Sequence, residues 1–337
     1  MAAGAYILAP STTSLRPEEA AFFRQADPWG FILFARNVDT PEQLRRLTGD
    51  LRAAVGRDAP IFIDQEGGRV QRMTPPIWRQ WTPPMDDCVR SGDNAARAIA
   101  LRYQIIAEEL RQAGIDGNCV PCLDLAFETT HPFLKNRCYG SDPEEVAAIG
   151  RAAAEACLAA GILPVIKHMP GHGRSETDSH EALPRVKATA ETLQNKDFIP
   201  FRELADFPLG MTGHLVFEAF DAAPATLSKT MIDLIRNEIG FTGLLMTDDI
   251  SMGALTGPMA ERCSTSIAAG CDLVLHCNGE MGEMEAVAEA TGRLEGVAKD
   301  RANAAMTARG RGPAQGDVDI EALMALFEQI MEGGSDA

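Results

Sequence analysis

The sequence contains few aromatic residues and no long apolar run. Aromatic residues make up 6% of the 337 positions, and the three tryptophans are too scattered to form a stacking platform. A helix that spans a membrane shows a run of about 18 or more apolar residues. No such run occurs here, so the sequence predicts no membrane span.

Basic charge is also scarce. The chain has 31 basic and 48 acidic residues, a formal net charge of −17, and no basic cluster or stripe. An acidic surface repels phosphate groups, which excludes nucleic acid as a partner. No basic segment precedes a long apolar stretch near the first residues, so we expect no secretory signal and a cytoplasmic location. We also expect no membrane attachment and no obligatory protein partner.

The eight cysteines are scattered along the chain. Cys119 and Cys122 form a C-x-x-C pair, which is found in half of a zinc site or in a redox pair. No second pair follows at zinc spacing, and no helix signature follows Cys122. We therefore expect small buried cysteines at a strand end, reduced in the cytoplasm, and neither a metal nor a cofactor.

Short apolar segments alternate regularly with helical patterns. Eight of these segments are typical of strands buried on both faces: Tyr6–Ala9, Gly30–Phe34, Ile61–Asp64, Gly114–Leu125, Leu163–His168, Gly210–Leu215, Gly243–Asp248 and Asp272–Cys277. Helical patterns with cap and charge signals lie between them: helices that start at residues 16 and 40, then 94–112, 141–161, 189–204, 229–239, 259–269, 282–297 and, last, 317–331.

Eight alternations of strand and helix favour an α/β fold, a single-domain (β/α)₈ TIM-type barrel. An open doubly wound sheet stays the alternative. We expect the catalytic barrel in residues 1–310, and a C-terminal helix with a disordered tail in 311–337. Residues 66–93 and 126–142 hold little strand or helix pattern, so we expect long loops there that contact a substrate.

Polar residues cluster where the predicted strands end: Asp64, Asp124, Lys167, His168, His214, Asp248, Asp249 and His276. In a barrel these ends converge on one open face. A charge at the end of an apolar strand is costly unless it is paired or used, so the convergence predicts an active site. We assign Asp124 a structural role. His214 could contact a ligand or be a satisfied core histidine, and His276 receives no role.

Residues 167–180, KHMPGHGRSETDSH, leave a buried strand, turn at two glycines and end in an Asp-x-His pair. Glycine allows backbone angles that other residues resist, so this loop can be mobile. In an extended stretch, residues i and i+2 share a face, so Asp178 can bond to the ring of His180. A paired carboxylate orients an imidazole, which makes His180 a candidate proton donor.

The stretch 243–252 brings two adjacent acids to the mouth of the predicted barrel. Adjacent residues of a strand point to opposite sides, so we assign Asp248 the role of nucleophile and Asp249 a structural or orienting role. In residues 64–72, DQEGGRVQR, Asp64 ends a strand and Arg72 can reach back to it. In such a pair the carboxylate accepts hydrogen bonds from sugar hydroxyls, and the guanidinium donates hydrogen bonds to them.

These segments together resemble glycoside hydrolase family 3, and within it the bacterial cytoplasmic β-N-acetylglucosaminidases of peptidoglycan recycling. The stretch from Leu234 to Asp248 is similar to the family's nucleophile motif, and KHMPGHGRSETDSH is similar to the marker of this branch. DQEGGRVQR and NRCYG (136–140) resemble two substrate-binding segments. The resemblance covers about residues 5–300. Met169 and Cys138 depart from the usual Phe and Ser, which affects fine geometry rather than chemistry.

The resemblance implies a role for each matching position. Substrate binding falls to Asp64, Arg72, Arg137, Lys167 and His168, and catalysis to Asp248, Asp178 and His180. It implies an exo-enzyme that releases terminal β-linked N-acetylglucosamine with retention, and a muropeptide-type disaccharide, GlcNAc-1,6-anhydro-MurNAc with or without peptide, as substrate. The chain is too short for the second domain of many family members, so the mobile histidine loop would supply the proton donor.

Three other mechanisms compete with retaining hydrolysis. The substrate's own acetamido group could attack, helped by the pair Asp248–Asp249, and phosphate could replace water as the acceptor. A metal-dependent barrel hydrolase could use His168, His172, His180, Asp178 and His214 as ligands, although H-M-P-G-H matches no usual zinc spacing. A carbohydrate-binding protein without catalysis is the remaining reading.

Overall fold

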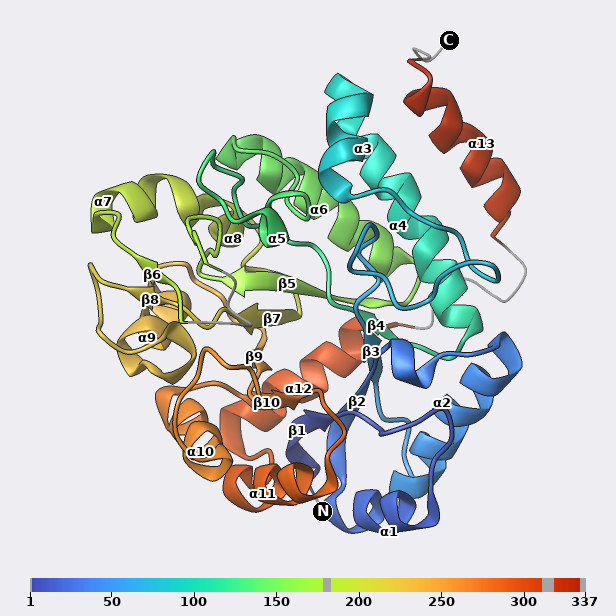
Figure 1. Cartoon of the computed structure of the whole chain (residues 1–337), viewed down its shortest axis with the longest axis vertical. Coiled ribbons are helices and arrows are strands. Elements are labelled where there is room, and N and C mark those ends of the chain that lie inside the picture. The colour runs from blue at the N-terminus through green and yellow to red at the C-terminus, as the bar shows by residue number, and fades with distance from the viewer. Residues whose placement is uncertain (1, 178–182, 311–317, 334–337) are drawn as a thin grey trace.

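The computed structural model describes residues 2–177, 183–310 and 318–333. Eight parallel strands close into one barrel in the order β1-β10-β9-β7-β5-β4-β3-β2, with β1 paired to both β10 and β2. Figure 1 shows the helices arranged around this barrel. The closed (β/α)₈ barrel predicted from the sequence is confirmed, and the open sheet is excluded.

The barrel strands are β1 (Gly4–Leu8), β2 (Pro28–Leu33), β3 (Ile61–Ile63), β4 (Gly117–Asn118), β5 (Leu163–Met169), β7 (Leu209–Thr212), β9 (Leu244–Asp249) and β10 (Leu273–His276). A small second sheet pairs β6 (Arg185–Val186) with β8 (Val216–Phe217). The helices are α1 (Pro17–Ala26), α2 (Pro41–Val55), α3 (Pro84–Ser91), α4 (Ala95–Gln112), α5 (Pro132–Lys135), α6 (Pro143–Ala159), α7 (Ala190–Thr192), α8 (Ile199–Glu203), α9 (Lys229–Asn237), α10 (Met259–Ala269), α11 (Met281–Thr291), α12 (Gly296–Ala308) and α13 (Ile320–Met331).

The strands have a core on each side, because adjacent side chains of a strand point in opposite directions. Ile7 and Phe62 belong to the cluster inside the barrel, together with side chains of most other strands. Their neighbours Leu8 and Ile63 pack outward against the helices. Helix α12 adds Ala302 and Ala305 to the inner cluster and so covers the end of the barrel opposite the strands' carboxyl ends (Figure 1).

Two predicted elements are interrupted. The predicted strand 114–125 contains regular pairing only at β4, because Pro121 has no N–H to donate to a ladder. The segment still follows β5, since Leu123 N–H donates to the Lys167 carbonyl at 2.7 Å. The predicted helix 282–297 ends at Thr291, where Gly292 takes a positive φ of 76°, and α12 begins anew.

The predicted helix 189–204 is also not continuous. A wide turn over Leu193–Asp197 separates α7 from α8, and in it Phe198 N–H bonds back to the Leu193 carbonyl at 2.9 Å. Pro200 in the first turn of α8 lacks an N–H and therefore cannot extend the helical ladder through this point.

The long connections 66–93 and 126–142 each contain a short helix, α3 and α5, which the sequence analysis missed. Arg102 from α4 holds the first connection in place. Its fully buried guanidinium bonds to the Asp87 carboxylate and to the carbonyls of Glu66 and Thr82. A buried cation of this kind is tolerated because its two terminal nitrogens have polar partners, and it fixes the loop that leads into the open face of the barrel.

The terminal helix α13 lies against α3 and α4 at the edge of the barrel (Figure 1). Phe327 packs edge-on against Trp81, with 5.5 Å between the ring centroids. The tail expected to be disordered falls mainly on residues outside the described ranges. In the described part of the chain, no helix combines the length and apolarity that a membrane crossing requires.

Candidate active site

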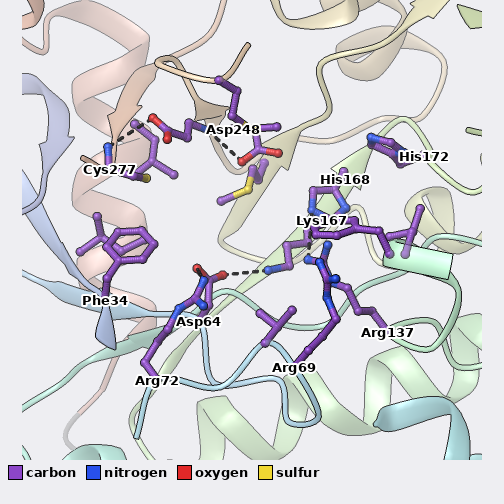
Figure 2. Close-up of a pocket in the computed structure, with 18 residues that line it drawn as sticks. Phe34, Asp64, Arg69, Arg72, Arg137, Lys167, His168, His172, Asp248 and Cys277 are labelled. Carbon is purple, nitrogen blue, oxygen red and sulfur yellow. Dashed lines mark hydrogen bonds and ion pairs between the residues drawn. The ribbon is translucent and has the colours of Figure 1, made fainter. Parts of the chain in front are cut away.

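A cavity of about 390 Å³ opens at the carboxyl ends of the strands, within the range of about 300–1,000 Å³ that is usual for small-molecule sites. Strands β2, β5, β7, β9 and β10, the residue that follows β3 and both long connections contribute to its wall. The polar side chains that line it are Asp64, Arg69, Arg72, Arg137, Lys167, His168, His172, Asp248 and Asp249. Figure 2 shows Asp248 on the opposite side of the cavity from Asp64, Arg72 and Arg137.

The floor of the cavity is a network of buried ion pairs. Lys167 Nζ lies 3.0 Å from an oxygen of Asp64 and 2.6 Å from an oxygen of Glu66. Arg137 binds both oxygens of Glu66, at 2.9 and 2.7 Å. Arg72 Nη2 reaches the other oxygen of Asp64 at 3.2 Å, as the sequence predicted. We refer to Asp64, Glu66, Arg72, Arg137 and Lys167 as the floor network.

Opposite charges in the floor network keep its members ionised. Burial alone would raise the pKa of Asp64 and of Glu66, but the cations of Lys167, Arg72 and Arg137 lower both values. Burial would likewise lower the pKa of Lys167, and the two carboxylates raise it instead. The network therefore presents charged hydrogen-bond donors and acceptors in one rigid arrangement, which suits a ligand that carries several hydroxyl groups.

His168 is oriented by Asp124 from the segment beside β5. The Asp124 Oδ2 atom lies 2.7 Å from His168 Nδ1, and Asp124 Oδ1 accepts the backbone N–H of His172 at 2.6 Å. A carboxylate only accepts and a guanidinium only donates. Nδ1 of His168 must then carry the proton, and Nε2, which lies 3.5 Å from Arg137 Nη2, acts as the acceptor. Burial would raise the pKa of Asp124, but the imidazoles and the backbone N–H lower it.

The adjacent acids of β9 have different surroundings. Asp249 accepts hydrogen bonds from Ser251 N–H at 3.1 Å, Ser251 Oγ at 2.8 Å and Cys277 N–H at 3.2 Å. For Asp248, the recorded hydrogen bond in the described chain comes from the N–H of Asp249 at 2.8 Å. Burial would raise the pKa of Asp248, yet the nearby imidazoles of His168 and His214 and this N–H lower it. Asp248 is thus an ionised carboxylate that faces the cavity.

The remaining strand-end histidines lie in the core. His214 is fully buried, with Nδ1 2.8 Å from Thr226 Oγ1 and Nε2 2.9 Å from the Asp249 carbonyl. His276 Nε2 pairs with Glu283 at 3.0 Å. Neither lines the cavity, so the expected convergence of all strand-end groups holds only for Asp64, Lys167, His168 and the two acids of β9.

The histidine segment is anchored at its beginning. Gly173 packs against the Leu125 backbone so closely that a Cβ atom would lie 2.0 Å from the Leu125 carbonyl oxygen. Arg174 forms a bidentate pair with Asp197 at 2.8–3.0 Å. The glycine therefore serves close packing at this point. Asp178 and His180, the predicted catalytic pair, lie outside the described residues.

Comparison with known proteins agrees with this arrangement. Residues 10–308 match the glycosyl hydrolase family 3 N-terminal domain. The chain belongs to glycoside hydrolase family 3. A β-hexosaminidase from Alkalilimnicola ehrlichii is 37% identical over 286 residues, 82% of each chain, and one from Pseudomonas aeruginosa is 32% identical over 332 residues, 96% of this chain and 97% of the relative.

Among solved structures, the chain is similar to NagZ from Neisseria gonorrhoeae in complex with N-trifluoroacetyl-D-glucosamine. The TM-score is 0.86 at 27% identity, and the match covers 99% of both chains. A family 3 β-N-acetylglucosaminidase from Paenibacillus gives the same TM-score at 28% identity, over 97% of this chain and 67% of the other. The resemblance to the N-acetylglucosaminidase branch therefore extends over the whole barrel.

The sequence analysis gave Glu66 no role and named His172 only as a ligand in the metal-dependent alternative. Glu66 is 1% exposed and joins Lys167 to Arg137, which come from distant segments. His172 is buried in the cavity wall, and burial lowers its pKa to about 4, so the ring is neutral at neutral pH. Glu66 stands two positions after a strand-end acid, on the same face of an extended chain, and this spacing was the available signal.

Proposed function

We propose that this family 3 hydrolase is a retaining exo-β-N-acetylglucosaminidase. The observation that carries the proposal is the position of Asp248, an ionised carboxylate that faces, across the cavity, a floor network suited to sugar hydroxyls. The names of the relatives above support N-acetylglucosamine as the sugar. Asp64, Arg72, Arg137, Lys167 and His168 would hold this sugar in the cavity.

The chemistry follows from a double displacement. Asp248 attacks the anomeric carbon while His180, oriented by Asp178, protonates the departing oxygen. A glycosyl ester forms on Asp248, and water then displaces it with His180 as the base. A second carboxylate beside the ionised nucleophile would add another negative charge, whereas a neutral imidazole adds none.

The finer parts of the proposal concern substrate and place. We propose GlcNAc-1,6-anhydro-MurNAc, with or without peptide, as the substrate, and peptidoglycan recycling in the cytoplasm as the role. The eight cysteines are all buried and unpaired, the state that a reducing compartment maintains. No cofactor and no protein partner is needed for the chemistry above.

The competing mechanisms find less support. Participation of the substrate's acetamido group requires a second acid to orient it, but Asp249 is occupied by Ser251 and Cys277. A metal centre built from the strand-end histidines would need His168, His172 and His214 together. Among the described residues, the one group of three ligand side chains within 4.8 Å is Cys122, Asp124 and His168. Phosphorolysis uses the same residues and differs only in the acceptor.

The test compares an aryl β-N-acetylglucosaminide with the matching β-glucoside, for the wild type and for Asp248→Ala. We expect turnover of the first substrate only, its loss in the variant, and a 2-fluoro sugar trapped as an ester on Asp248. Label on Asp249 would refute the assignment. A product analysis with and without phosphate distinguishes hydrolysis from phosphorolysis, and a tightly binding thiazoline would instead favour acetamido participation.

The role of His180 has a test of its own. His180→Ala should reduce turnover of substrates with poor leaving groups far more than turnover of activated aryl substrates, because only poor leaving groups need protonation. Equal losses on both substrates would contradict a proton-donor role.

A further inference from the structure

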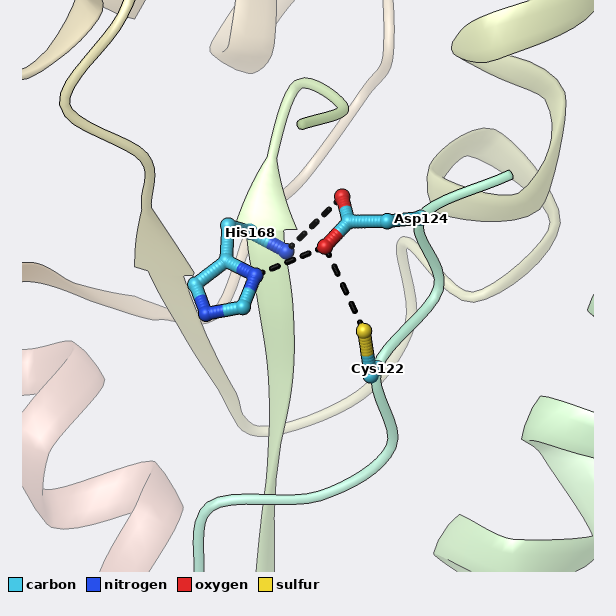
Figure 3. A group of neighbouring side chains, drawn as sticks. All are labelled: Cys122, Asp124 and His168. Carbon is cyan, nitrogen blue, oxygen red and sulfur yellow. Dashed lines mark hydrogen bonds and ion pairs between the residues drawn. The ribbon is translucent and has the colours of Figure 1, made fainter. Parts of the chain in front are cut away.

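A group of soft and borderline metal ligands lies directly behind the cavity wall. The side chains of Cys122, Asp124 and His168 offer a sulfur, an oxygen and a nitrogen that all lie within 4.8 Å of one another. Figure 3 shows the Asp124 carboxylate between the Cys122 thiol and the His168 ring. Cys122 Sγ lies 3.3 Å from Asp124 Oδ2, which lies 2.7 Å from His168 Nδ1.

One sulfur, one imidazole nitrogen and one carboxylate oxygen are ligands that Zn²⁺ accepts, and a tetrahedral site with three protein ligands takes water at its fourth position. The ligand atoms of a tetrahedral ion lie about 3.3–3.8 Å apart for bonds of about 2.0–2.3 Å, so the 2.7 Å contact between Asp124 and His168 has to widen.

We propose that Cys122, Asp124 and His168 form a regulatory site for a soft divalent cation of the zinc class, with water as the fourth ligand. The sulfur ligand disfavours hard cations such as Mg²⁺, which prefer oxygen. All three side chains are at least 90% buried, and His168 alone of the three lines the cavity, so the cation enters from the cavity.

Loading the site changes the hydrogen bonding of His168. In the metal-free protein, Nδ1 carries the proton toward Asp124 and Nε2 accepts from Arg137. A cation on Nδ1 takes the lone pair of that nitrogen, so the ring proton must move to Nε2 or leave. With the proton on Nε2, the N–H groups of His168 Nε2 and Arg137 Nη2 are two donors that face each other at a separation of 3.5 Å. The Cys122 thiol proton is released to solvent as the metal–sulfur bond forms.

The loaded state therefore opposes sugar binding. His168 would turn from an acceptor into a donor in the cavity wall, and Arg137 would lose a contact that orients it. Coupling between two ligands is reciprocal. A bound sugar therefore lowers the affinity for the cation by the same factor by which the cation lowers the affinity for the sugar. This inhibitory consequence rests on the proposed function, whereas cation binding itself does not.

Binding is measured first on the wild-type chain with Co²⁺ as a spectroscopic substitute for Zn²⁺. We expect a thiolate-to-cobalt charge-transfer band in the near ultraviolet that Zn²⁺ abolishes and Mg²⁺ leaves unchanged. N-Acetylglucosamine at saturating concentration should weaken the band at a given Co²⁺ concentration. Absence of the thiolate band in wild type overturns the site, whatever any variant does and whatever the enzyme hydrolyses.

The variant that isolates the site is Cys122→Val, which removes a ligand outside the sugar-contacting wall. We expect unchanged basal turnover, loss of the thiolate band and an increase of more than about 10-fold in the Zn²⁺ concentration that halves activity. The matched control is Cys157→Val, a buried cysteine of α6 outside the group, which should behave like wild type. Cys122→Ala provides a second variant if Cys122→Val folds poorly.

The inhibition data separate this site from any other zinc site on the chain. Equal sensitivity of wild type and Cys122→Val to Zn²⁺, with the thiolate band retained in the variant, overturns the assignment of Cys122. Equal sensitivity with the band lost overturns the regulatory consequence, because the cation would then inhibit elsewhere.

Discussion

The charged side chains on the two sides of the cavity differ in their hydrogen-bond partners. On the side of β3 and β5, Asp64, Glu66, Arg137 and Lys167 pair with one another at 2.6–3.0 Å. On the side of β9, Asp248 has one recorded hydrogen bond within the described chain, from a backbone N–H. Both sides hold ionised groups in a cavity wall, but only on the first side does each of these side chains form an ion pair with another of them.

This difference matches the roles proposed for the two sides, sugar recognition on the first and nucleophilic attack on the second. Charges that position a ligand benefit from rigid partners, since fixed donors and acceptors lose little entropy when the ligand binds. A nucleophile must keep an oxygen available for the reacting carbon, so partners on that oxygen would oppose the attack. The neighbouring Asp249 shows the contrast within one strand, because three local donors occupy it.

The strongest test of the comparison substitutes each of the two β9 acids in turn. Asp248→Asn should reduce kcat by about 10⁴-fold or more, because the nucleophile is lost, with little change in the free energy of unfolding. Asp249→Ala should lower the free energy of unfolding by about 1–3 kcal/mol, because buried donors lose their acceptor. Kinetics and denaturant titration of both variants measure this. A stable Asp249→Ala together with an unstable Asp248→Asn would contradict the assignment.

The floor network should show the reverse behaviour. Lys167→Met removes the cation that pairs with Asp64 and Glu66. Removal of one partner from a buried ion pair lowers the free energy of unfolding by about 3–5 kcal/mol. We expect a large fall in the free energy of unfolding together with loss of substrate binding. Lys229→Met, which removes an exposed pair with Asp233, is the control and should change stability by no more than about 1 kcal/mol. Equal effects of the two substitutions would show that the network is not preorganised.

A smaller effect is expected where Asp124 supports His168. Asp124→Asn replaces a charged acceptor with a neutral one, and a hydrogen bond to a charged group is worth about 1.5–3 kcal/mol. We expect kcat/KM to fall by about 10–100-fold, mainly through KM, because the imidazole loses the carboxylate that orients it. Asp124→Glu should restore part of the activity. A fall in stability without a change in KM would indicate a packing role only.

The smallest predicted effect concerns acid stability. In the folded chain the pKa of Glu66 is lowered from 4.5 to about 2, chiefly by Arg137 and Lys167 against the opposing effect of burial. A lowered pKa stabilises the fold above the unfolded value, and this contribution is lost as the pH falls from about 5 to about 2. Glu66→Gln should flatten the dependence of unfolding free energy on pH in this window by up to one proton. An unchanged slope would mean that Glu66 does not titrate between the two states.

The sequence predicted the fold and most of the cavity. Apolar segments with interposed helices predicted eight strands, and the polar residues at their ends predicted where Asp64, Lys167, His168 and Asp248 would gather. The sequence left two roles open for His214, because local pattern carries no information on the direction of a side chain. The structure decides for a core histidine, with the ring turned toward Thr226.

The division between sequence and structure follows from the range of the interactions. Periodicity and caps are local, so the chain by itself determined strands, helices and their closure into a barrel, together with the polar residues that stand at the strand ends. Glu66 meets Arg137 across 71 residues and Lys167 meets Asp64 across 103. Only the closed barrel brings such segments together, so tertiary structure alone decided which charges are paired and which carboxylate stays available for reaction.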